Sequence, residues 1–567
     1  MFFRRYRTEV LIVLAALAIA AAWVPIRMRF PFDDTYITFR YAANLAHGFG
    51  IVWNSGGAHT EGCTTFLFML LLAPFSWMGW DLVVVSQGIS VVAVVVSAIA
   101  IYRIVGAHGN APDNVSITGR IAMRPYGIFA VAFFLFDPFT WLNAYSGMET
   151  SLFTMWLLLA VLSSSPTMTK SLVLSNSEED SALSHRGRWT QHSALSFVFA
   201  TLAALTRPEG AIIGGVLFIV LAFSTRTKVT KVTEGALSSF LSIAIPAFYF
   251  FVLPLMLYAL WKLWYFGNLL PNSFYIKVSQ ASGGTLLPGR GAMRIFYQGV
   301  WYLLILAVVA SWKARKNVAV QMAVLWCILL SIFYLFSRLI SNEYQRFTYS
   351  MEVMLILLSG FAFAAIGRSI RNKWIGCVAF GLLLALHIFW TLQHRGGMYY
   401  IQRDTEYMSR YSRVAPVLRS IPDHEHITLA WGDAGRLPYM SELLNIDPVG
   451  LNTNEIAHAH TTQEVVNFII RSKPDMIIIP LSLPSDTSDT CYTVLRGGDG
   501  LIGSGYVALT VETVASRYRA IAMIPQTVYD LEIFVDTYSP HYRDIVNTLV
   551  PRVGHDSDFL PPAKCIR

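Results

Sequence analysis

The feature that most constrains this chain is a series of apolar runs about as long as a membrane-crossing helix. A helix needs about 20 apolar residues to cross the hydrocarbon core of a bilayer. With 54% hydrophobic and only 14% charged residues, a chain of 567 residues is too apolar for a soluble protein. We therefore expect a polytopic α-helical membrane protein with about 11 transmembrane helices. The candidate spans, several of them short, are residues 9–26, 81–103, 124–139, 149–165, 193–206, 210–225, 237–261, 294–312, 318–338, 348–367 and 374–393.

The positive-inside rule sets the expected orientation of these helices. With the N-terminus in the cytoplasm, every loop expected on the inner side carries Lys or Arg. The apolar run 63–79 contains Pro74 and follows a polar loop, so we expect an interfacial helix there; a span would invert all later loops. We thus expect a cytoplasmic N-terminus, an uncleaved first helix and a C-terminal domain on the outer side of the membrane.

After about residue 394 the apolar runs shorten to the length of strands. "HITLAWG", "DMIIIPL", "YVALTVETV", "YRAIAMI" and "DLEIFVD" alternate with the helix-like stretches "TTQEVVNFIIRS" and "YRDIVNTLVPR". This alternation predicts a compact α/β domain. We expect a transmembrane domain (1–393, with an extracytoplasmic loop, 28–80) and an extracytoplasmic α/β domain (394–567). Cys491 and Cys565 fit either a disulfide or two free thiols.

Charged residues gather just after the first apolar run, in "FPFDDTYITFRYAANLAHGFGIVWNSGGAHTEG". Asp33 and Asp34 stand at the expected start of a helix, where the helix dipole favours negative charge. One interpretation is therefore a capped interfacial helix. A cap needs one acid, however, and this stretch adds a second acid together with Arg40, His47 and Glu61. Asp33 and Asp34 are therefore candidate catalytic residues.

The other loops expected on the outer side add acids, cations and amides to the same face. Each group alone suits a solvated helix end. Outward cations nevertheless run against the positive-inside bias, and guanidinium groups suit bidentate phosphate binding. The candidate phosphate ligands are Arg40, Arg207, Lys277 and Arg346. The candidate substrate-binding residues are Tyr36, His47, Glu61, Glu149, Glu209, Asn272 and Tyr275.

Carboxylates and phosphate-binding cations at an outer membrane surface indicate one reaction. A lipid phosphate would hold an activated sugar in the bilayer, and a carboxylate would take a proton from an acceptor hydroxyl. The cations would stabilise the phosphate as it departs. This chemistry is glycosyl transfer from a polyprenyl-phosphate sugar.

Five motifs in order along the chain carry a resemblance to a known class. "DDTYITFRYAANLAHGFGIVWNSGGAHTEGCTTFL" resembles the first extracytoplasmic loop of the GT-C membrane glycosyltransferases. "SGMETSLF", "TRPEG", "YFGNLLPNSFYIK" and "GDAGRLPYMSELLNIDPVGLN" are similar to a bacterial branch that includes the mycobacterial terminal arabinofuranosyltransferases. The resemblance implies that Asp33 or Asp34 is the base of an inverting displacement. It also implies that outward basic residues bind the donor phosphate and that the C-terminal domain helps to hold the acceptor. The resemblance further implies a bacterial inner (cytoplasmic) membrane protein whose C-terminal domain is periplasmic.

The expected partners are a polyprenyl-phosphate sugar (arabinofuranose among the candidates), a cell-envelope glycan, lipid or protein acceptor, and membrane lipids. The sequence shows no P-loop or dinucleotide motif and no clustered basic and aromatic patch for nucleic acid. No His, Asp and Glu cluster has metal-ligand spacing, so no cofactor is expected. A divalent cation at Asp33 and Asp34 stays open.

A transporter or flippase of a lipid-linked or anionic substrate is the alternative function. Such a protein should show internal repeats and broken helices with polar residues near the bilayer midplane, and the sequence shows neither. His387, inside the last expected span, is the main ionisable exception, and we expect it to be packed and hydrogen-bonded. A third interpretation is a non-catalytic scaffold whose outer domain binds cell-wall polymer.

Overall fold

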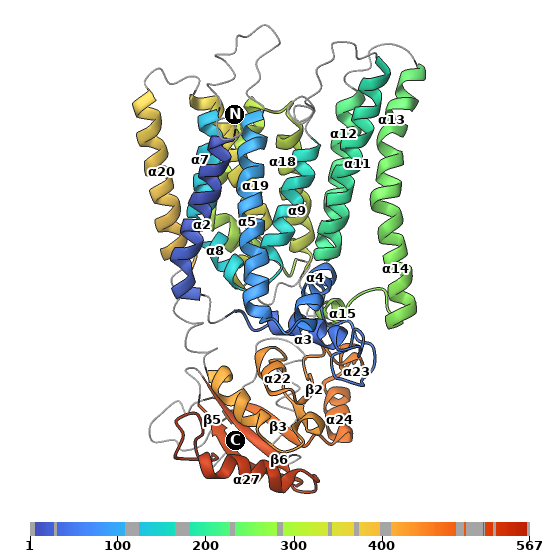
Figure 1. Cartoon of the computed structure of the whole chain (residues 1–567), viewed down its shortest axis with the longest axis vertical. Coiled ribbons are helices and arrows are strands. Elements are labelled where there is room, and N and C mark those ends of the chain that lie inside the picture. Colours follow the sequence, from blue (N-terminus) through green and yellow to red (C-terminus); the bar gives the residue numbers. More distant parts are fainter. Residues whose placement is uncertain are drawn as a thin grey trace.

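The helices of the computed structural model stand side by side in one bundle, and a smaller unit with a sheet lies at one end of it (Figure 1). Each expected span has a counterpart in a bundle helix or in a pair of consecutive helices. The structure describes residues 6–27, 31–107, 124–164, 182–226, 233–279, 287–337, 343–367, 373–396, 410–482, 493–494, 514, 516–525 and 529–563.

Six helices among the described residues are long and apolar enough to cross a membrane, or up to 8 when two bent pairs each count as one span. The six are α2 (Arg7–Arg27), α5 (Leu82–Ala107), α13 (Thr233–Ala247) continued through the π-helix η3 (Phe248–Val252) into α14 (Leu253–Phe266), α18 (Val318–Leu335), α19 (Tyr349–Gly367) and α20 (Lys373–Gln393). The bent pairs are α7 (Arg124–Phe136) with α8 (Pro138–Tyr145), at 55°, and α16 (Arg290–Gly299) with α17 (Trp301–Lys313), at 79°.

Three further helices of the bundle have shorter apolar stretches: α9 (Thr150–Ser163), α11 (Ala182–Thr206) and α12 (Ala211–Arg226). They run alongside the longer helices (Figure 1). The polytopic helical fold is therefore confirmed. Length and composition alone support six to eight spans, and the expected eleven are reached only when these three helices also cross.

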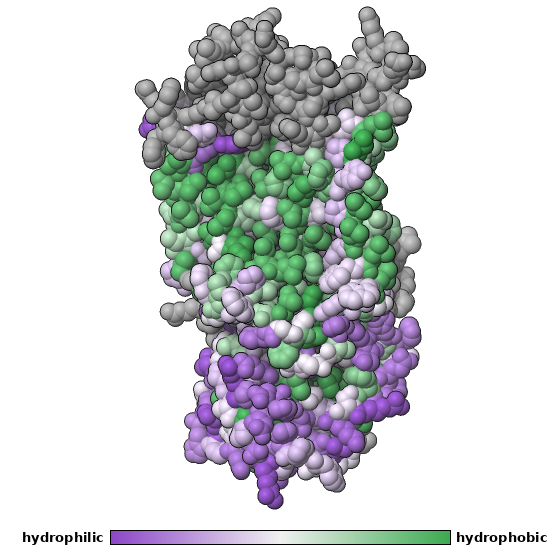
Figure 2. Space-filling view, turned by 45° about the vertical axis from the view of Figure 1, so that its right-hand side comes forward, coloured by the Kyte–Doolittle hydropathy of each residue, from purple (hydrophilic) through white to green (hydrophobic). Residues whose placement is uncertain are grey.

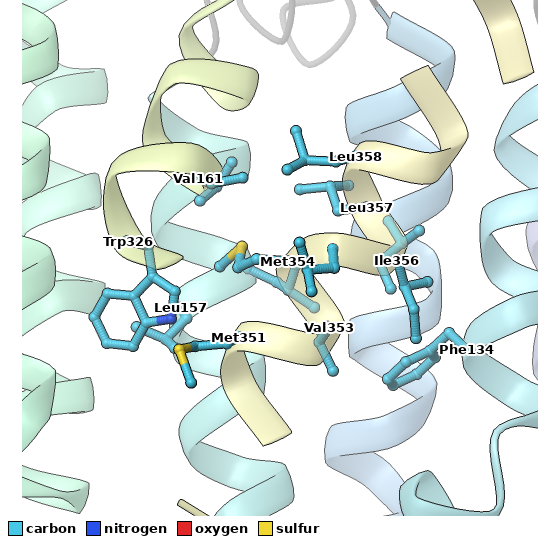
Figure 3. Close-up of a cluster of buried hydrophobic side chains, with 14 of the residues drawn as sticks. Phe134, Leu157, Val161, Trp326, Met351, Val353, Met354, Ile356, Leu357 and Leu358 are labelled. Carbon is cyan, nitrogen blue, oxygen red and sulfur yellow. The ribbon is translucent and has the colours of Figure 1, made fainter. Parts of the chain in front are cut away.

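Helix α19 forms the centre of the bundle, since its residues from Tyr349 to Phe361 are all buried. Side chains of four helices meet there (Figure 3). Met354 and Leu357 of α19 are buried in one cluster with Phe134 of α7, Leu157 of α9 and Trp326 of α18. This packing fixes the ends of α9, α18 and α19, which matter for the site below.

On the face seen in Figure 2, the surface of the bundle is mostly apolar, whereas that of the sheet-containing unit is mostly polar. Large side chains such as Trp264, Phe223 and Leu382 are more than 60% exposed on bundle helices. Exposed apolar surface of this extent on a helical bundle is explained by contact with lipid tails. The chain is thus a multi-pass membrane protein.

Two short helices, α3 (Thr35–Ala46) and α4 (Phe66–Trp77), lie at the end of the bundle that faces the sheet (Figure 1). Helix α4 has 12 residues and contains Pro74. It is too short to cross a bilayer, in agreement with the interfacial helix expected over 63–79. The helix α15 (Asn272–Ser279) lies at the same end.

The C-terminal unit is built on one mixed sheet with the strand order β2-β1-β3-β6-β5 and β4 paired to β3. The strands are β1 (Thr428–Ala430), β2 (Leu444–Ile446), β3 (Met476–Ser482), β4 (Thr493–Val494), β5 (Tyr518–Ile524) and β6 (Tyr529–Asp536). β1 pairs in parallel with β2 and β3, whereas β6 is antiparallel to β3 and β5. The described helices of this unit include α22 (Arg436–Ser441), α23 (Asn454–Ala457), α24 (Thr462–Ser472) and α27 (Tyr542–Leu549).

The expected α/β character of the C-terminal third is confirmed. Four of the five expected strands are β1, β3, β5 and β6, and both expected helices are present as α24 and α27. The expected strand "YVALTVETV" lies outside the described residues except for its last one, and Cys491 and Cys565 lie outside them as well. The domain boundary near residue 394 stays a prediction.

Candidate functional site

The two adjacent aspartates stand in the turn that begins α3. The backbone N–H of Phe32 donates to the carbonyl of Ser146, at 2.9 Å, which ties this turn to the C-terminal end of α8. Asp34 is the N-cap residue of α3, but its side chain makes no capping hydrogen bond. The interpretation of these acids as simple helix caps is therefore wrong, and both carboxylates have other partners.

Asp34 is paired with Arg346. The Nη2–Oδ2 distance is 2.7 Å, and the Asp34 side chain is 37% exposed, against 11% for Arg346. The guanidinium of Arg346 also lies over the rings of Phe32 (5.1 Å) and Phe347 (4.9 Å). Its buried Nε has no hydrogen-bond partner among the described residues. One carboxylate of the aspartate pair is thus accessible and stands beside a cation with a donor to spare.

Arg207 also lies over the ring of Phe347. Its guanidinium is 5.0 Å from the centre of the Phe347 ring, and it bonds Glu149 at 2.9 Å and Glu209 at 2.6 Å. The hydroxyl of Tyr334 donates to Glu209 at 3.0 Å. Arg207, Glu149 and Tyr334 are buried, and Glu209 and Phe347 are partly buried. Four of the expected site residues outside the aspartate turn (Glu149, Arg207, Glu209 and Arg346) therefore meet around one ring.

The start of α9 adds polar atoms to this cluster. The Oε2 atom of Glu149 and the hydroxyls of Thr150 and Ser151 are buried and have no hydrogen-bond partner among the described residues. Buried polar atoms in folded proteins are normally hydrogen-bonded to protein or water. The N-terminus of a helix also favours negative charge. The two hydroxyls at the start of α9 suit an anionic group, whereas Glu149 Oε2 can only accept a hydrogen bond from a ligand donor such as a hydroxyl.

Asp33, in contrast, faces the C-terminal unit. Its Oδ1 accepts a hydrogen bond from the backbone N–H of Arg436 at 2.8 Å, and its side chain is only 9% exposed. Burial, with the nearby Asp433 carboxylate, raises the pKa of Asp33 to about 7. Neighbours in sequence thus have different environments: Asp33 is enclosed, and Asp34 is open and paired with a cation.

Arg40 connects α3 and the first loop to the C-terminal unit through hydrogen bonds. Its guanidinium donates to the carbonyls of Trp53, Pro438 and Leu443, each at 2.8 Å, and to Oδ1 of Asn54 at 3.0 Å. These contacts hold α3 against the C-terminal unit. They favour an anchoring role over the expected phosphate contact, because the donors are already engaged with buried carbonyls.

Glu61 has a partner that sequence analysis missed. Lys262, on α14, lies 2.7 Å from Glu61, and both side chains are buried. Burial raises the pKa of Glu61 to about 7, although Lys262 opposes the shift. The only sequence signal for this pair was an isolated Lys within the apolar run "LPLMLYALWKLWYF". A charged residue in such a run calls for a partner.

The remaining expected residues lie apart from the Phe347 cluster. Tyr36 is buried beneath the guanidinium of Arg436 (4.8 Å) and beside the ring of Tyr439 (5.4 Å). The exposed His47 ends α3, where its Nδ1 lies 2.7 Å from the carbonyl oxygen of Ala43. These two residues of the first loop thus serve the packing and the end of α3.

The expected residues of α15 face the C-terminal unit. Asn272 donates to Asn454 at 2.9 Å, and the ring of Tyr275 packs against His458 at 4.5 Å. The side chain of Lys277 lies outside the described residues. The substrate roles expected for Asn272 and Tyr275, and the phosphate role of Lys277, stay predictions.

A second buried polar network lies next to the site. Tyr302 Oη is 2.6 Å from Nδ1 of His387, so His387 is packed and hydrogen-bonded, as expected. Arg395, just after α20, pairs with Glu352 and donates to Gln345. No group of three or more His, Cys, Asp or Glu side chains within the described residues is placed to hold a metal ion.

Comparison with solved structures defines the class of this fold. The structure resembles the Archaeoglobus fulgidus oligosaccharyltransferase in its apo form, with a TM-score of 0.54 and 12% identity over 92% of this chain and 80% of that one. AglB of the same organism, solved with an inhibitory peptide and a dolichol-phosphate, matches with a TM-score of 0.53, again at 12% identity, over 93% and 80% of the two chains. The chain therefore has a GT-C-like fold, which resembles that of these membrane transferases.

Further comparisons add a third structure with a similar fold and a family match of unknown function. ArnT of Cupriavidus metallidurans bound to undecaprenyl phosphate matches with a TM-score of 0.50 and 14% identity, over 94% of this chain and 99% of that one. Residues 400–539 match a family described as a domain of unknown function (DUF8728). No curated protein matches the chain. At these identities the likeness establishes the fold, and the chemistry has to be argued from the site.

Proposed function

We propose that this protein is an inverting glycosyltransferase that moves a sugar from a polyprenyl-phosphate donor to an acceptor hydroxyl. The single observation that supports this most is the accessible Asp34 carboxylate beside Arg346, with Arg207 on the same Phe347 ring. A base and phosphate ligands are the groups that such a transfer needs. Two proteins with this fold were solved with a lipid phosphate, dolichol-phosphate in one and undecaprenyl phosphate in the other.

Asp34 is the better base of the aspartate pair. Its side chain is 37% exposed, and its one ion-pair partner among the described residues is Arg346. Asp33 is enclosed by the backbone of the C-terminal unit. A base must lie within hydrogen-bond reach of the proton that it removes, so the open carboxylate is the one an acceptor can approach.

In the proposed reaction the donor phosphate binds Arg346 through its fork of N–H groups, including the Nε without a partner. Asp34 is thereby released from its ion pair and takes the proton of the acceptor hydroxyl. The acceptor oxygen forms the new bond to the anomeric carbon as the bond from that carbon to the phosphate oxygen breaks. The electron pair leaves with the polyprenyl phosphate, whose charge Arg346 stabilises with help from Arg207.

The membrane setting follows from the same assignment. The site lies at the end of the bundle that carries α3, α4 and the C-terminal unit (Figure 1), which we place outside the cytoplasmic membrane of a bacterium, with the N-terminus inside. A polyprenyl chain would lie along the apolar bundle surface while its phosphate reaches the polar cluster. The acceptor would be a glycan, lipid or protein of the cell envelope. Polyprenyl-phosphate arabinofuranose is the first donor to test, because of the sequence motifs.

The test is a transfer assay with the purified full-length protein in lipid nanodiscs. A panel of polyprenyl-phosphate sugars is added with a mixture of envelope acceptors, and released polyprenyl phosphate is measured. We expect release with one donor. Asp423→Asn changes an exposed Asp of the C-terminal unit and serves as the matched control for Asp34→Asn. Movement of intact donor across the bilayer, without release of polyprenyl phosphate, would show a flippase instead.

A further inference from the structure

The C-terminal unit reaches into the turn that carries the two aspartates. The loop "GDAGR" precedes α22, and its Arg436 N–H donates to Asp33. The guanidinium of Arg436 continues past this bond and donates to the carbonyl of Pro31 at 2.7 Å. Arg436 is fully buried. Arg436 therefore bonds the turn on both sides of Phe32: its backbone N–H donates to Asp33, and its side chain donates to Pro31.

Gly435 shows how closely the loop is seated. A Cβ atom built at this position would overlap both the carboxylate and the backbone carbonyl of Asp33. The φ angle of Gly435 is −85°, so glycine is needed here for space rather than for a left-handed backbone. The loop and Asp33 are thus packed backbone to side chain, with no room for an acceptor sugar between them.

We propose that Asp33 is a positioning residue that clamps the 433–436 loop of the C-terminal unit onto the aspartate turn, while Asp34 alone acts on the acceptor. This inference rests on the proposed function for the role of Asp34. The clamp needs a hydrogen-bond acceptor at position 33 and does not need a charge. The C-terminal unit is then a fixed part of the lining of the reaction site. Asp33 has a structural role, and Asp34 has the chemical one.

The physical reason lies in the backbone. Asp33 and Asp34 are consecutive, and the carbonyl of Asp33 accepts the N–H of Tyr36 in the first turn of α3. Arg436 holds the Asp33 side chain and the Pro31 carbonyl at the same time. These two contacts fix the backbone of the turn and so the direction in which the Asp34 side chain points. Asp34 then points to Arg346. A general base that is displaced by about 1 Å loses much of its effect.

Two substitutions at Asp33 separate a clamp from a base. Asp33→Asn keeps an amide oxygen that accepts the Arg436 N–H, and it removes the repulsion with Asp433. Asp33→Leu has a similar size and no acceptor. We expect Asp33→Leu to lower transfer by about 100-fold, and Asp33→Asn to recover to within about tenfold of the wild type, since an amide replaces one hydrogen bond with another.

Gly435→Ala tests the same contact without touching either aspartate. Its added Cβ should push the loop from Asp33, and hydrogen exchange at the Arg436 amide should rise in Gly435→Ala and in Asp33→Leu. In Asp33→Asn that amide should stay protected. Hydrogen–deuterium exchange of the full-length protein, read on the peptide that contains residue 436, measures this independently of activity.

The outcomes separate this inference from the proposed function. If Asp33→Asn is as inactive as Asp34→Asn while its Arg436 amide stays protected, Asp33 takes part in the chemistry and the inference is wrong. If Asp33→Leu leaves the amide as protected as in the wild type, the clamp does not exist. A wild-type protein that releases no polyprenyl phosphate from any donor overturns the proposed function, and the exchange data still decide on the clamp.

Discussion

Arg346 is the residue whose role in donor binding is easiest to isolate. Its only ion pair among the described residues is with the exposed Asp34, whereas Arg207 neutralises two buried carboxylates. We expect Arg346→Ala to weaken donor binding roughly ten- to 100-fold, the worth of one hydrogen bond to a charged group. The donor affinity of Arg346→Lys should lie between those of the wild type and Arg346→Ala, because an ammonium keeps the positive charge but lacks the bidentate N–H groups of the guanidinium.

The measurement is a titration of each variant with donor and, separately, with acceptor. Acceptor affinity should change little. Arg471→Ala, at an exposed position of α24, is the matched control. Donor affinity that is unchanged in Arg346→Ala would remove this residue from the phosphate site.

The enclosed carboxylate of Asp33 makes the stability of the protein depend on pH. Its pKa is raised from 3.8 to about 7, first by burial and then by Asp433, with a smaller effect of Asp34, while the Arg436 N–H and guanidinium oppose the shift. A raised acid pKa means that the folded state binds the proton more tightly than the unfolded one. The stabilisation is fully present below the ordinary pKa of 3.8 and is lost as pH rises from there to about 7.

We therefore expect the melting temperature in detergent to fall as pH rises from about 4 to about 7, and to level off above that. Asp33→Asn should reduce this slope, since one unit of pKa shift corresponds to about 1.4 kcal/mol. Part of the slope should persist, because the pKa values of Glu61, Asp447 and Glu532 are also raised to about 7. An unchanged slope in Asp33→Asn would contradict the assignment.

Single residues were the least predictable level. The acids and cations of Asp34, Arg207 and Arg346 could be selected from the sequence, because charges beside apolar runs need a reason. Their partners could not. Asp33 and Arg436 are separated by 403 positions, and no local pattern in the sequence encodes a contact over that distance.

At the scale of elements, the segment that carries Arg346 is held in a strained conformation. Tyr344 and Gln345 have φ angles of 51° and 56°, which cost about 1–3 kcal/mol each for residues other than glycine. Arg395 donates to the Gln345 side chain, and Asn143 donates to the Tyr344 carbonyl at 3.0 Å. The structure around this segment thus presents Arg346 toward Asp34 at some energetic cost.

Removing Arg395 should therefore release the segment and also leave Glu352 buried without its cation. We expect Arg395→Met to destabilise the protein by about 3–5 kcal/mol. The double variant Arg395→Met with Glu352→Gln should recover part of this loss. Thermal unfolding measures both, and Arg315→Met, on an exposed turn, is the control. Equal loss in the single and double variants would show that the ion pair contributes nothing.

Elements themselves were largely predictable. Long apolar runs predicted the bundle helices, and the change to short alternating runs predicted β1, β3, β5 and β6. The breaks inside the runs were harder. The sequence predicts one helix over 124–139, but α7 ends at Phe136 and a second helix, α8, begins at Pro138. Asp137 caps α8, because its side chain accepts the N–H of Phe139. Asp137 followed by Pro138 is a typical helix start, so the local signal was present but outweighed by hydropathy.

At the scale of the whole molecule, the first loop and the C-terminal unit form one interface. Arg40 makes four hydrogen bonds across or beside it. Trp53 and Asn54 bond Asn445, and Tyr41 bonds Asn452. The C-terminal unit is therefore built onto the loop that carries the aspartates, rather than attached by a linker alone.

Loss of the Arg40 contacts should loosen this interface. We expect Arg40→Met to raise hydrogen exchange over residues 438–446 by about tenfold or more, because buried carbonyls lose a charged donor. The core of the bundle around α19 should keep its protection. Arg471→Met serves as the control. Unchanged exchange over residues 438–446 would show that Arg40 does not hold the interface.

The contact between the first loop and the C-terminal unit could not be predicted from the sequence. Composition separated a membrane part from an α/β part, but it carried no information on which loop of the first meets which edge of the second. Arg40 was expected to bind phosphate because its charge stood outside the membrane. Its place within the interface depends on the packing of α3 against the loop before β2, which only the assembled fold reveals.

The central claim is that the open carboxylate of Asp34 removes the proton of the acceptor while Arg346 and Arg207 take the charge of the departing lipid phosphate. The most direct test is a single-turnover measurement on Asp34→Asn with donor and acceptor bound at saturating concentration. The claim predicts donor affinity equal to or above that of the wild type, and release of polyprenyl phosphate slowed by about 10²–10⁴-fold. Release at the wild-type rate from donor-saturated Asp34→Asn would contradict it.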